Sequence, residues 1–472
     1  MKQLLSYLIL LLLVSKFVVL TGCANIIPPT GGPRDSIPPR LISVDPKDSS
    51  KHFKSNQIIF NFDEYIELKD IRENLVVSPV PKTEPIIDSK LRTLTVKLKD
   101  TLEPNTTYSL NFGKAIRDIN EGNILKNFTY VFSTGSYLDS LQLSGNVVLA
   151  TTGKTDSTLI VMLHRNLQDS AVVKERPRYF TRLDSGGNFI FRNLAQGVYA
   201  IYALKDEAGL KRYTSKTQLF AFADSPVVLH GYNRPITLYA FADTTGSKPP
   251  KKATPLAASK PKAPDKDKRL ILQTNLNNGF LDLLVNLEIS FPAPLRTFDS
   301  SKIQFTDENF KDISQGHFRM DSTGKKITLV YNWAIGIKYH LIAEKEFAED
   351  TAGRKLTKTD TLNFQTKKES DYGHLVIRFS NLDLSRIPVL QFIQKDEIKL
   401  SVPLHSQKYE GKLFQPGEYE MRILYDDNKN GVWDPGDFFK HRQPEKVQLI
   451  RTPSRKPLNV KADWDNEVDI TL

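Results

Sequence analysis

Cysteine is almost absent from this chain of 472 residues, which contains only Cys23. A single cysteine excludes a disulfide within the chain and a zinc site built on cysteines. The usual catalytic signatures are missing as well. The eight histidines show no His-Glu-x-x-His spacing, and no Gly-x-Ser-x-Gly turn occurs. These absences favour a protein that is not an enzyme and has no catalytic cofactor.

Charge of one sign is not concentrated in any folded part of the sequence. Lys and Arg number 65 and Asp and Glu 54, which gives a formal charge of +11, but the basic residues are dispersed. Nucleic-acid binding usually needs clustered basic residues interleaved with aromatic ones. We therefore expect no nucleic-acid partner.

The N-terminus is the one long apolar region. Lys2 precedes the apolar run Leu4–Val14, and Phe17–Leu20 leads into Thr21-Gly22-Cys23. A charged start, an apolar stretch and small residues before a cut site are typical of a secretory signal. Leu20-Thr21-Gly22-Cys23 resembles the lipobox of bacterial lipoproteins. That resemblance implies removal of residues 1–22 and attachment of acyl chains, such as palmitate, to Cys23.

Lipidation would make a membrane the first partner of this chain, since two or more acyl chains give stable anchoring. Residue 24 is Ala rather than Asp, so the usual cue for retention at the inner membrane is missing. We expect an outer-membrane location, with the periplasmic and the exposed side both open. A plain signal peptide or a short membrane anchor is the alternative.

Two segments have the composition of spacers. Residues 23–37 are rich in Pro and Gly and predict an extended tether. Residues 243–268 combine Pro, Ala, Ser and seven lysines, which cannot build a core. This linker is either a solvated spacer or a contact to an anionic envelope surface such as lipopolysaccharide or peptidoglycan.

The rest of the chain alternates apolar and polar residues. The segments QIIFNF (57–62), TLTVKL (93–98) and TYSLNF (107–112) each place apolar or aromatic residues at every second position. Period two with β-branched and aromatic residues indicates half-buried strands. Short strands separated by frequent turns predict an all-β fold of stacked sandwiches.

The sequence also repeats itself in the order A-B-A-B. In the A units, Tyr108 precedes Thr134 by 26 residues, and Tyr339 precedes Thr366 by 27. In the B units, FIFRNLAQGVYAIYALKD (189–206) matches YEGKLFQPGEYEMRILYD (409–426). We expect domains at residues 38–136, 140–242, 269–368 and 371–472.

These units resemble two families. The A units are similar to bacterial Ig-like domains of the SbsA type, through "LEPNTTYSLNF", the "RDINEGN" loop and "YVFST". The B units are similar to prealbumin-like modules of the Cna-B type, through the pattern F-x-F-x-N-L-x-x-G-x-Y. PPTGGPRDSIPP after Cys23 resembles Ig-like lipoproteins of Bacteroidota. We call the four units the first and second Ig-like modules and the first and second prealbumin-like modules.

One loop in the second prealbumin-like module has the spacing of a calcium site. In DDNKNGVWDPGD, oxygen side chains recur at the positions used by calcium loops, with Gly431 at the sharp turn. The expected ligands are Asp426, Asn428, Asn430, the carbonyl of Val432, Asp434 and Asp437. Asp437 stands where Glu is usual, so we expect weak binding, on the order of 10⁻⁴–10⁻³ M. The alternative is a two-residue Asn430–Gly431 hairpin turn.

The triplet Asp-Ser/Thr followed by an apolar residue or Thr occurs nine times and resembles the O-glycosylation acceptor of Bacteroidota. The implied acceptors are Ser36, Thr101, Ser140, Ser157, Ser170, Thr244, Ser322, Thr351 and Thr361. The alternative is that Asp-Ser/Thr ends a turn before the next strand.

We expect, in sum, an outer-membrane scaffold or a surface adhesion module that contacts envelope proteins or glycans. The alternative is a carbohydrate-binding lipoprotein of a glycan uptake system. Trp333, Trp433 and Trp464 are candidates for sugar stacking, although a place in the core is the commoner role for tryptophan.

Overall fold

The computed structural model describes residues 34–242, 269–454 and 456–472. The predicted signal peptide with Cys23, most of the predicted tether, the predicted linker and Thr244 lie outside the described residues. The chain divides into two compact units, which are treated separately below. The first holds the residues up to Leu141 with Arg192–Gln196, and the second holds Gln142–Phe191 and Gly197–Leu472. In the part of the chain that is described, no helix has the length and apolar character needed to cross a membrane.

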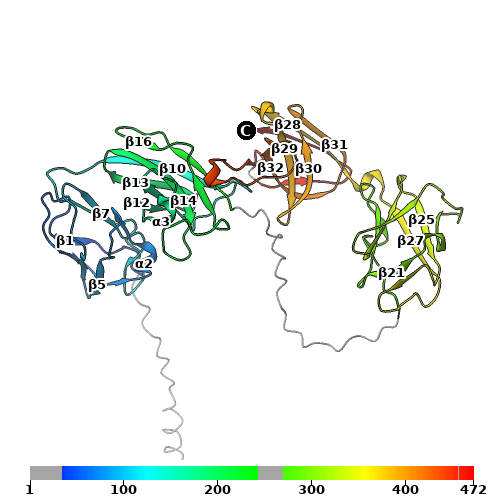
Figure 1. The fold of residues 1–472 in the computed structure, drawn as a ribbon, viewed down its shortest axis with the longest axis horizontal. Coiled ribbons are helices and arrows are strands. Elements are labelled where there is room, and N and C mark those ends of the chain that lie inside the picture. The colour runs from blue at the N-terminus through cyan, green and yellow to red at the C-terminus, as the bar shows by residue number, and fades with distance from the viewer. Residues whose placement is uncertain (1–33, 243–268, 455) are drawn as a thin grey trace, which may run out of the picture. The chain divides into compact units, whose positions relative to one another are not determined.

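The first unit contains the first Ig-like module (Figure 1). Its sheets have the strand orders β1-β2-β6-β5, β4-β7-β9 and β3-β8. The elements are β1 (Leu41–Asp45), β2 (Gln57–Phe62), β3 (Ile66–Leu68), α2 (Ile71–Asn74), β4 (Val76–Ser78), β5 (Ile86–Lys90), β6 (Thr93–Lys97), β7 (Thr107–Asn111), β8 (Ile116–Asp118) and β9 (Thr129–Ser133).

The alternating residues of these strands form the core of the sandwich. Ile58, Phe60 and Phe62 of β2 are at most 1% exposed, whereas their neighbours Asn61 and Gln57 are not buried. The ring of Phe60 lies edge-on to Tyr130 of the facing sheet, with 5.2 Å between centroids. The alternation of apolar and polar residues therefore turns one face of each strand into the core, and it places aromatic rings between the two sheets.

The second Ig-like module, in the second unit, repeats this plan. Its orders β18-β20-β24-β23, β19-β27-β25-β22 and β21-β26 match those of the first module, with β19 added at one edge. The elements are β18 (Gln273–Thr274), β19 (Phe280–Leu281), β20 (Leu287–Ser290), β21 (Leu295–Phe298), η1 (Ser300–Lys302), β22 (Ile303–Asp307), β23 (His317–Met320), β24 (Lys326–Val330), β25 (Lys338–Ala343), β26 (Ala348–Asp350) and β27 (Asp360–Thr366).

The repeated Tyr and Thr make the same contacts in both Ig-like modules. The hydroxyl of Tyr108 accepts the backbone N–H of Glu103 at 2.9 Å, and Thr134 Oγ1 donates to Glu103 O at 2.7 Å. In the second copy, Tyr339 accepts the N–H of Ala334, and Thr366 Oγ1 donates to Ala334 O at 2.6 Å. The spacing recurs because each pair closes the turn that enters its strand.

The two prealbumin-like modules also share one strand order. The first has β13-β10-β17 and β12-β11-β14-β15, with β16 on β14. Its elements are β10 (Leu141–Leu149), β11 (Leu159–His164), α3 (Ala171–Lys174), β12 (Tyr179–Arg182), β13 (Asn188–Leu194), β14 (Gly197–Lys205), β15 (Phe220–Phe222), β16 (Val227–Leu229) and β17 (Ile236–Ala240).

The second prealbumin-like module has β31-β28-β35 and β30-β29-β32-β33, with β34 on β32. Its elements are η2 (Glu369–Asp371), β28 (Gly373–Ser380), η3 (Leu384–Arg386), β29 (Pro388–Gln394), β30 (Glu397–Pro403), β31 (Lys408–Phe414), β32 (Gly417–Tyr425), η4 (Phe438–Lys440), β33 (Lys446–Ile450), β34 (Leu458–Val460) and β35 (Asp465–Thr471). The prediction of an all-β chain of tandem sandwiches is confirmed.

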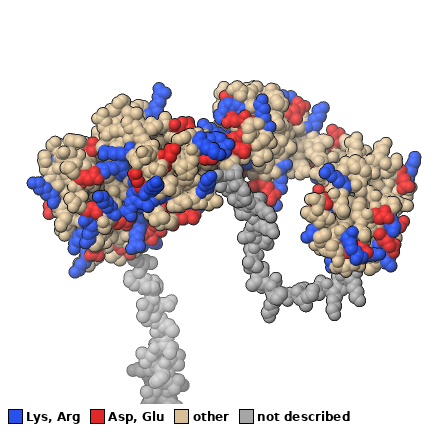
Figure 2. Space-filling model, in the orientation of Figure 1, with Lys and Arg blue, Asp and Glu red and all other residues tan. Residues whose placement is uncertain are grey.

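Charges of both signs cover the surface. Figure 2 shows Lys and Arg interspersed with Asp and Glu on the face in view. Several of them form ion pairs across neighbouring strands, such as Lys326 Nζ with Glu288 at 2.8 Å. Such exposed pairs contribute little to stability, so this surface is a solvated one.

Candidate functional site

The predicted calcium loop joins β32 to β33 in the second prealbumin-like module. Twenty residues, 426–445, separate the two strands, so the alternative of a two-residue Asn430–Gly431 hairpin turn is wrong. Lys429 and Gly431 both have positive φ angles, 63° and 77°. The backbone therefore reverses sharply twice, and Gly431 makes the second reversal without strain from a side chain.

Asp426 and Asp434 organise the first half of the loop. Asp426 is 2% exposed, and its carboxylate accepts the backbone N–H groups of Asn430 at 3.1 Å and Gly431 at 2.6 Å. Asp434 Oδ2 accepts the side-chain amides of Asn428 and Asn430, each at 2.6 Å. Four of the predicted ligands are thus brought together, with amide protons facing the carboxylate of Asp434.

The other two predicted ligands lie differently. Val432 is 64% exposed, and its backbone N–H donates to Asn430 Oδ1 at 2.7 Å. Asp437 exchanges backbone hydrogen bonds with Arg442, and its carboxylate pairs with Lys440 Nζ at 3.5 Å. The carboxylate at the twelfth position is therefore engaged by a lysine of the following turn.

Glu445 is a further carboxylate that the twelve-residue spacing does not include. It is 6% exposed, and its Oε2 accepts the backbone N–H of Asp434 at 3.0 Å. Burial raises the pKa of Glu445, and the nearby charges of Asp426 and Asp434 raise it further. Only the fold brings Glu445 to the loop, because it follows Asp426 by nineteen residues, at the entry to β33.

The donor set fits a hard cation in chemical type. Two loop carboxylates, two amides and Glu445 can all supply oxygen. A cation would offset the burial and, to a smaller extent, the neighbouring charges that raise the pKa of Glu445. Each amide would have to turn by half a rotation to present oxygen instead of N–H. Among the described residues, no three His, Cys, Asp or Glu side chains are arranged closely enough to hold a metal ion by themselves.

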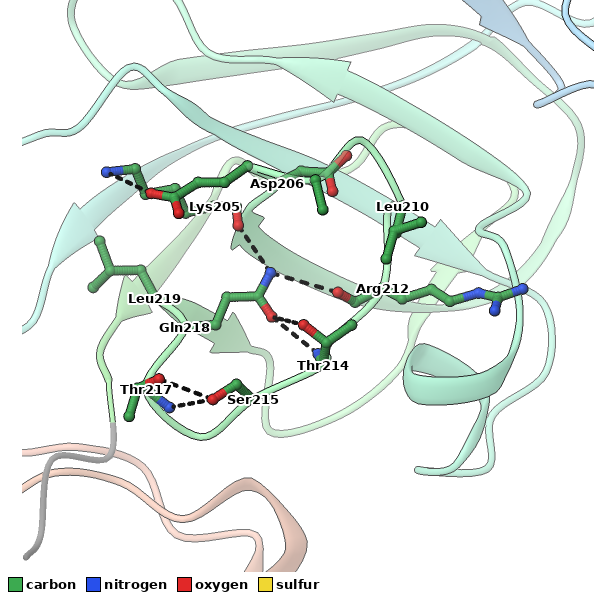
Figure 3. Close-up of a pocket in the computed structure, with 11 residues that line it drawn as sticks. Lys205, Asp206, Leu210, Arg212, Thr214, Ser215, Thr217, Gln218 and Leu219 are labelled. Atoms are coloured by element: carbon green, nitrogen blue, oxygen red, sulfur yellow. Dashed lines mark hydrogen bonds and ion pairs between the residues drawn. The ribbon is translucent and has the colours of Figure 1, made fainter.

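The corresponding loop of the first prealbumin-like module surrounds a pocket instead. Residues 206–219 join β14 to β15, and Asp206 Oδ1 accepts the backbone N–H of Lys211 at 3.0 Å. The pocket has a volume of about 410 Å³. Figure 3 shows Gln218 at its centre, where the amide donates to Lys205 O at 2.8 Å and accepts from Thr214 N at 3.0 Å.

The lining of this pocket is mixed. Basic and acidic side chains, short hydroxyl side chains and two leucines contribute, but none of the lining residues is aromatic. A pyranose ring is usually held by stacking on an aromatic face. The pocket therefore lacks the platform that a sugar site would need, and Gln218 uses its amide to hold the loop together.

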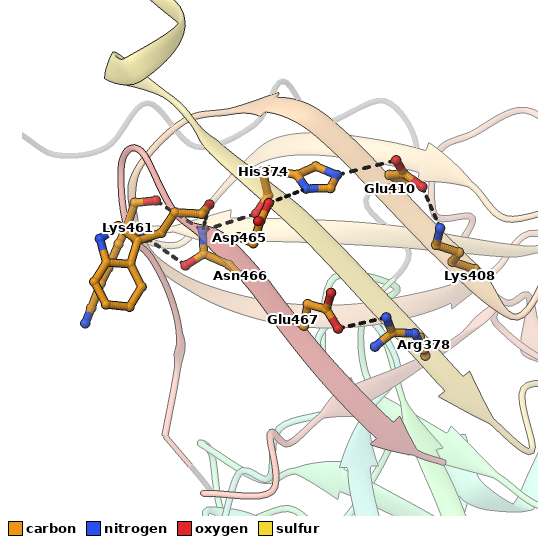
Figure 4. A network of polar contacts seen from close by, with 9 residues as sticks. His374, Arg378, Lys408, Glu410, Lys461, Asp465, Asn466 and Glu467 are labelled. Atoms are coloured by element: carbon orange, nitrogen blue, oxygen red, sulfur yellow. Dashed lines mark hydrogen bonds and ion pairs between the residues drawn. The ribbon is translucent and has the colours of Figure 1, made fainter.

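A network of charged side chains covers the outer face of β31-β28-β35 in the second prealbumin-like module (Figure 4). His374 Nδ1 lies 2.8 Å from Asp465 and Nε2 lies 3.4 Å from Glu410. The contact with Asp465, followed by that with Glu410, raises the pKa of His374. Arg378 Nη2 donates to Glu467 at 2.8 Å further along the sheet.

The first prealbumin-like module has a histidine of the opposite kind. His164 at the end of β11 is 1% exposed, and its Nε2 has no hydrogen-bond partner among the described residues. Burial lowers the pKa of His164 to about 4. The imidazole lies edge-on to Tyr202 with 5.6 Å between ring centroids, and the lowered pKa keeps it neutral at neutral pH.

The tryptophans fall into two groups. Trp333 packs against the core of its module, and Trp433 donates its indole N–H to Glu445 O at 2.8 Å beside a small buried cluster. Trp464 is 61% exposed, with Lys461 Nζ 4.6 Å from the ring centre. A core position, the commoner role, is wrong for Trp464.

The implied glycosylation acceptors are mostly accessible. Seven of them are exposed, namely Ser36, Thr101, Ser140, Ser157, Ser322, Thr351 and Thr361. Ser170 is half-buried before α3, and Thr244 lies outside the described residues. The preceding aspartates also form the expected turns, since Asp156 accepts Thr158 N and Asp350 accepts Ala352 N, both at 2.9 Å. These positions are therefore both exposed, as glycosylation needs, and part of turns, as the alternative expects.

Comparison with protein families assigns the first Ig-like module. Residues 35–134 match the family described as "Bacterial Ig-like domain". This confirms the Ig-like expectation for that module and covers less than half of the chain. No curated protein matches the chain.

Several solved structures are similar over long stretches at low identity. The Bacillus anthracis TIE protein is 11% identical over 94% of this chain and 75% of that chain, with a TM-score of 0.17. The major pilin subunit BcpA of Bacillus cereus is 9% identical over 70% and 99%, with a TM-score of 0.16. The BSP domain of a biofilm-associated protein is 10% identical over 84% and 96%, with a TM-score of 0.17. At these scores, no arrangement can be transferred from those chains to this one.

Proposed function

We propose that the protein is a non-catalytic component of a bacterial cell envelope, anchored in the outer membrane by lipid on Cys23 and acting as a scaffold or adhesion module. The observation that carries the proposal is the duplicated pair of sandwiches, which share strand orders and have filled cores. An Ig-like module at residues 35–134 supports a structural role at the cell surface or in the envelope. Repeated sandwiches supply spacing and surface rather than a deep reactive cleft.

The anchor is tested by metabolic labelling with an alkyne analogue of palmitate. Wild-type protein should carry the label and remain in the membrane fraction. Cys23→Ser, which keeps the whole apolar leader, should lose the label. Unlabelled wild-type protein in the membrane fraction would instead identify the leader itself as the anchor.

The side of the membrane is tested by treating intact cells with trypsin. Release of peptides from residues 269–472 without lysis would place the second pair of modules outside the cell and support adhesion. Protection of those peptides until lysis would favour a periplasmic scaffold, with the lysine-rich linker near peptidoglycan. A periplasmic marker protein that stays intact controls for leakage.

We further propose that the 426–445 loop binds calcium weakly, with Asp426, Asn428, Asn430, Val432 and Asp434 as ligands. Two observations support Glu445 rather than Asp437 as the additional acid: Glu445 accepts the backbone N–H of Asp434, whereas the carboxylate of Asp437 pairs with Lys440. Calcium in the millimolar range should change the fluorescence of Trp433, whose indole N–H is bonded to Glu445 O.

Variants distinguish the two acids. Glu445→Gln should raise the calcium Kd by about tenfold, since a carboxylate ligand contributes charge as well as an oxygen. Asp437→Asn should change the Kd by less than about threefold, because the carboxylate of Asp437 faces Lys440 at the surface. The matched control is Asp206→Asn in the first prealbumin-like module, which should change nothing. An effect of Asp437→Asn alone would restore the twelve-residue assignment.

O-glycosylation of the exposed acceptors is also proposed. Peptides of the native protein that contain Ser322 or Thr351 should carry added sugar mass, which Asp321→Asn or Asp350→Asn should remove. Native peptides without added mass at any of the nine sites would leave the turn as the reason for the triplet.

Glycan binding is the second candidate function, and the exposed ring of Trp464 is the observation that favours it. An oligosaccharide that stacks on Trp464 should shift its fluorescence and should displace Lys461 from the ring. Trp464→Ala should abolish the shift, whereas Trp333→Phe should preserve it. Equal responses of both variants would exclude Trp464 as the platform.

A further inference from the structure

One buried aromatic residue of the second prealbumin-like module does not belong to that module's core. Phe438 lies on η4, directly after the predicted calcium loop, and is 4% exposed. It is not part of the core clusters formed by the strands of its own module. Its burial therefore needs another explanation.

The explanation is a set of four rings from the first prealbumin-like module. The centroid of Phe438 lies 5.1 Å from Phe220, 5.3 Å from Phe222, 5.7 Å from Tyr202 and 6.2 Å from Tyr213. All four contacts are edge-to-face, the geometry that aromatic quadrupoles prefer. We call these four residues the aromatic socket. Tyr202 is on β14, Phe220 and Phe222 are on β15, and Tyr213 comes from the 206–219 loop.

The backbones of the two modules approach closely beside the socket. A Cβ added to Gly436 would lie 2.7 Å from the ring of Phe241. A Cβ added to Gly153 would lie 2.9 Å from Leu449 N and from Val447 O. A side chain at Gly153 would meet only β33 of the other module, whereas one at Gly436 would also meet Arg442 O and Pro444 N of its own loop. The absence of a side chain at Gly153 is therefore the one that the contact between modules requires.

Polar groups complete the contact at its edges. Gln443 Nε2 donates to Phe222 O at 3.0 Å and to Asp224 at 2.8 Å. Arg422 Nη1 donates to Thr151 O at 2.9 Å. Lys154 Nζ pairs with Glu420 at 2.7 Å. A buried aromatic centre with hydrogen bonds around it is the composition of a specific interface.

We propose that the two prealbumin-like modules bind each other within one chain, with Phe438 inserted into the aromatic socket. The second Ig-like module then lies on a stretch of chain whose two ends are held together. A tether between two surfaces gives an effective concentration in the millimolar range, so an interface of modest affinity closes within the chain before it joins two chains. The proposal does not depend on lipid, calcium or membrane location.

This contact gives the divergent loops complementary roles. The 206–219 loop supplies Tyr213 to the socket, and the 426–445 loop carries Phe438 and Gln443 to it. The two modules share a strand order, and the loops after their matched strands β14 and β32 form the two sides of one interface.

A pair of engineered cysteines tests the contact directly. The Cβ built on Gly153 lies 3.4 Å from the Cβ of Leu449, near the separation that a disulfide requires. Gly153→Cys with Leu449→Cys is made in a Cys23→Ala chain, so that the new thiols are alone, and a protease site is inserted in the 243–268 linker. After oxidation and cleavage, the two halves should migrate as one band and separate upon reduction.

The control pair joins Leu449→Cys to Gly231→Cys, since Gly231 has open space around it. Its yield of bridged halves should be about tenfold lower, because the two sulfurs are not held adjacent. Bridging between two full chains instead of within one would overturn the proposal in favour of a dimer. Equal yields from both pairs would overturn it altogether.

A second measurement avoids cysteine at Gly153, whose φ of +69° disfavours any side chain. Phe438→Ala should increase hydrogen exchange in the Phe220–Phe222 strand by about tenfold or more, because its covering ring is lost. Phe439 is 52% exposed and its ring lies near Tyr213 at the edge of the socket, 6.4 Å between centroids. Phe439→Ala should therefore change exchange in the Phe220–Phe222 strand by much less than Phe438→Ala does. Unchanged exchange in Phe438→Ala would mean that the socket is closed by something else.

Discussion

The two prealbumin-like modules have one strand order and two different sets of loops. β14 and β32 are each nine residues long, begin with glycine and place a buried tyrosine two residues later, at Tyr199 and Tyr419. The loops that follow these strands differ: the loop after β14 surrounds a pocket, and the loop after β32 is organised by Asp426 and Asp434. The sheets therefore determine where a loop begins and ends, while the residues between those points can differ and take a separate role.

The two prealbumin-like modules also differ in where they place histidine. His164 pairs with Ala200 in β14, and the corresponding position in the second module is Ile393, which pairs with Glu420 in β32. One copy therefore buries an imidazole where the other buries an apolar side chain. His374, in contrast, is on an outer face among carboxylates.

The largest expected effect comes from the residue that joins the two modules. Phe438→Ala should lower the free energy of unfolding by about 3–5 kcal/mol, the usual result of removing a buried aromatic ring. Phe439→Ala should change it by less than about 0.5 kcal/mol, as an exposed substitution does. Urea denaturation followed by Trp433 fluorescence measures both. Equal losses would remove the distinction between the two neighbouring rings.

His164 should make the first prealbumin-like module sensitive to acid. Its pKa is about 4 in the folded state and 6.5 in the reference state, so the unfolded chain binds the proton more readily. The contribution of neutral His164 to the free energy of unfolding is therefore fully present above pH 6.5. It decreases as the pH falls towards 4, by about 3 kcal/mol in total. His164→Ile, which copies Ile393, should abolish this decrease. Hydrogen exchange of β11 peptides between pH 4 and 7 measures it.

The glycines of the two loops give a smaller and matched effect. Gly209 and Gly431 have φ angles of 71° and 77°, and a Cβ on either one would meet nothing within 4 Å. Alanine at each should cost only the backbone strain, about 1–2 kcal/mol. Local hydrogen exchange should therefore rise similarly in both variants. Calcium should protect the wild-type 426–445 loop and fail to protect Gly431→Ala, whereas Gly209→Ala should leave that protection intact.

His374 should give the smallest effect, with the opposite sign to His164. Its folded pKa is raised by Asp465 and Glu410, so its contribution is fully present below the unfolded value of 6.5 and is lost as the pH rises through the folded pKa. Because the site is exposed, salt should weaken this contribution. His374→Gln should remove a small shift in the denaturation midpoint between pH 6 and 8. A shift that persists in high salt would indicate burial instead.

Much of the fold follows from local patterns. The alternation in residues 57–62 and 107–112 predicts strands, because a half-buried strand must place apolar side chains on one face. Tyr108 with Thr134 and Tyr339 with Thr366 mark the same turn in both copies, because each pair makes hydrogen bonds to the residues just before its strand. Such contacts span short or repeated distances along the chain, so they leave a signature in the sequence.

Only the first half of the candidate calcium site could be predicted from the sequence. Asp426, Asn428, Asn430 and Asp434 were identified because one loop supplies them at fixed spacing, and their side chains do lie together. The approach of Glu445 was not identified, since it depends on how the chain returns to β33. The pairing of Asp437 with Lys440 is local, but the calcium spacing assigned Asp437 to the ligand set instead. The 61% exposure of Trp464 also depends on the tertiary fold, because most tryptophans lie in a core and its sequence neighbours do not mark it as an exception.

The strand pattern, the repeat and the first half of the 426–445 loop can be predicted from the amino-acid sequence, because each depends on residues that are near in the chain or repeated along it. The burial of Phe438 by Phe220 and Phe222 of another module cannot be predicted in this way and is known only from the folded structure. Phe438 lies on a three-residue turn, so no hydrophobic periodicity in the sequence indicates which residues cover its ring. Its burial depends on two surfaces separated by more than two hundred residues, and that pairing is selected by shape and contact in the folded chain.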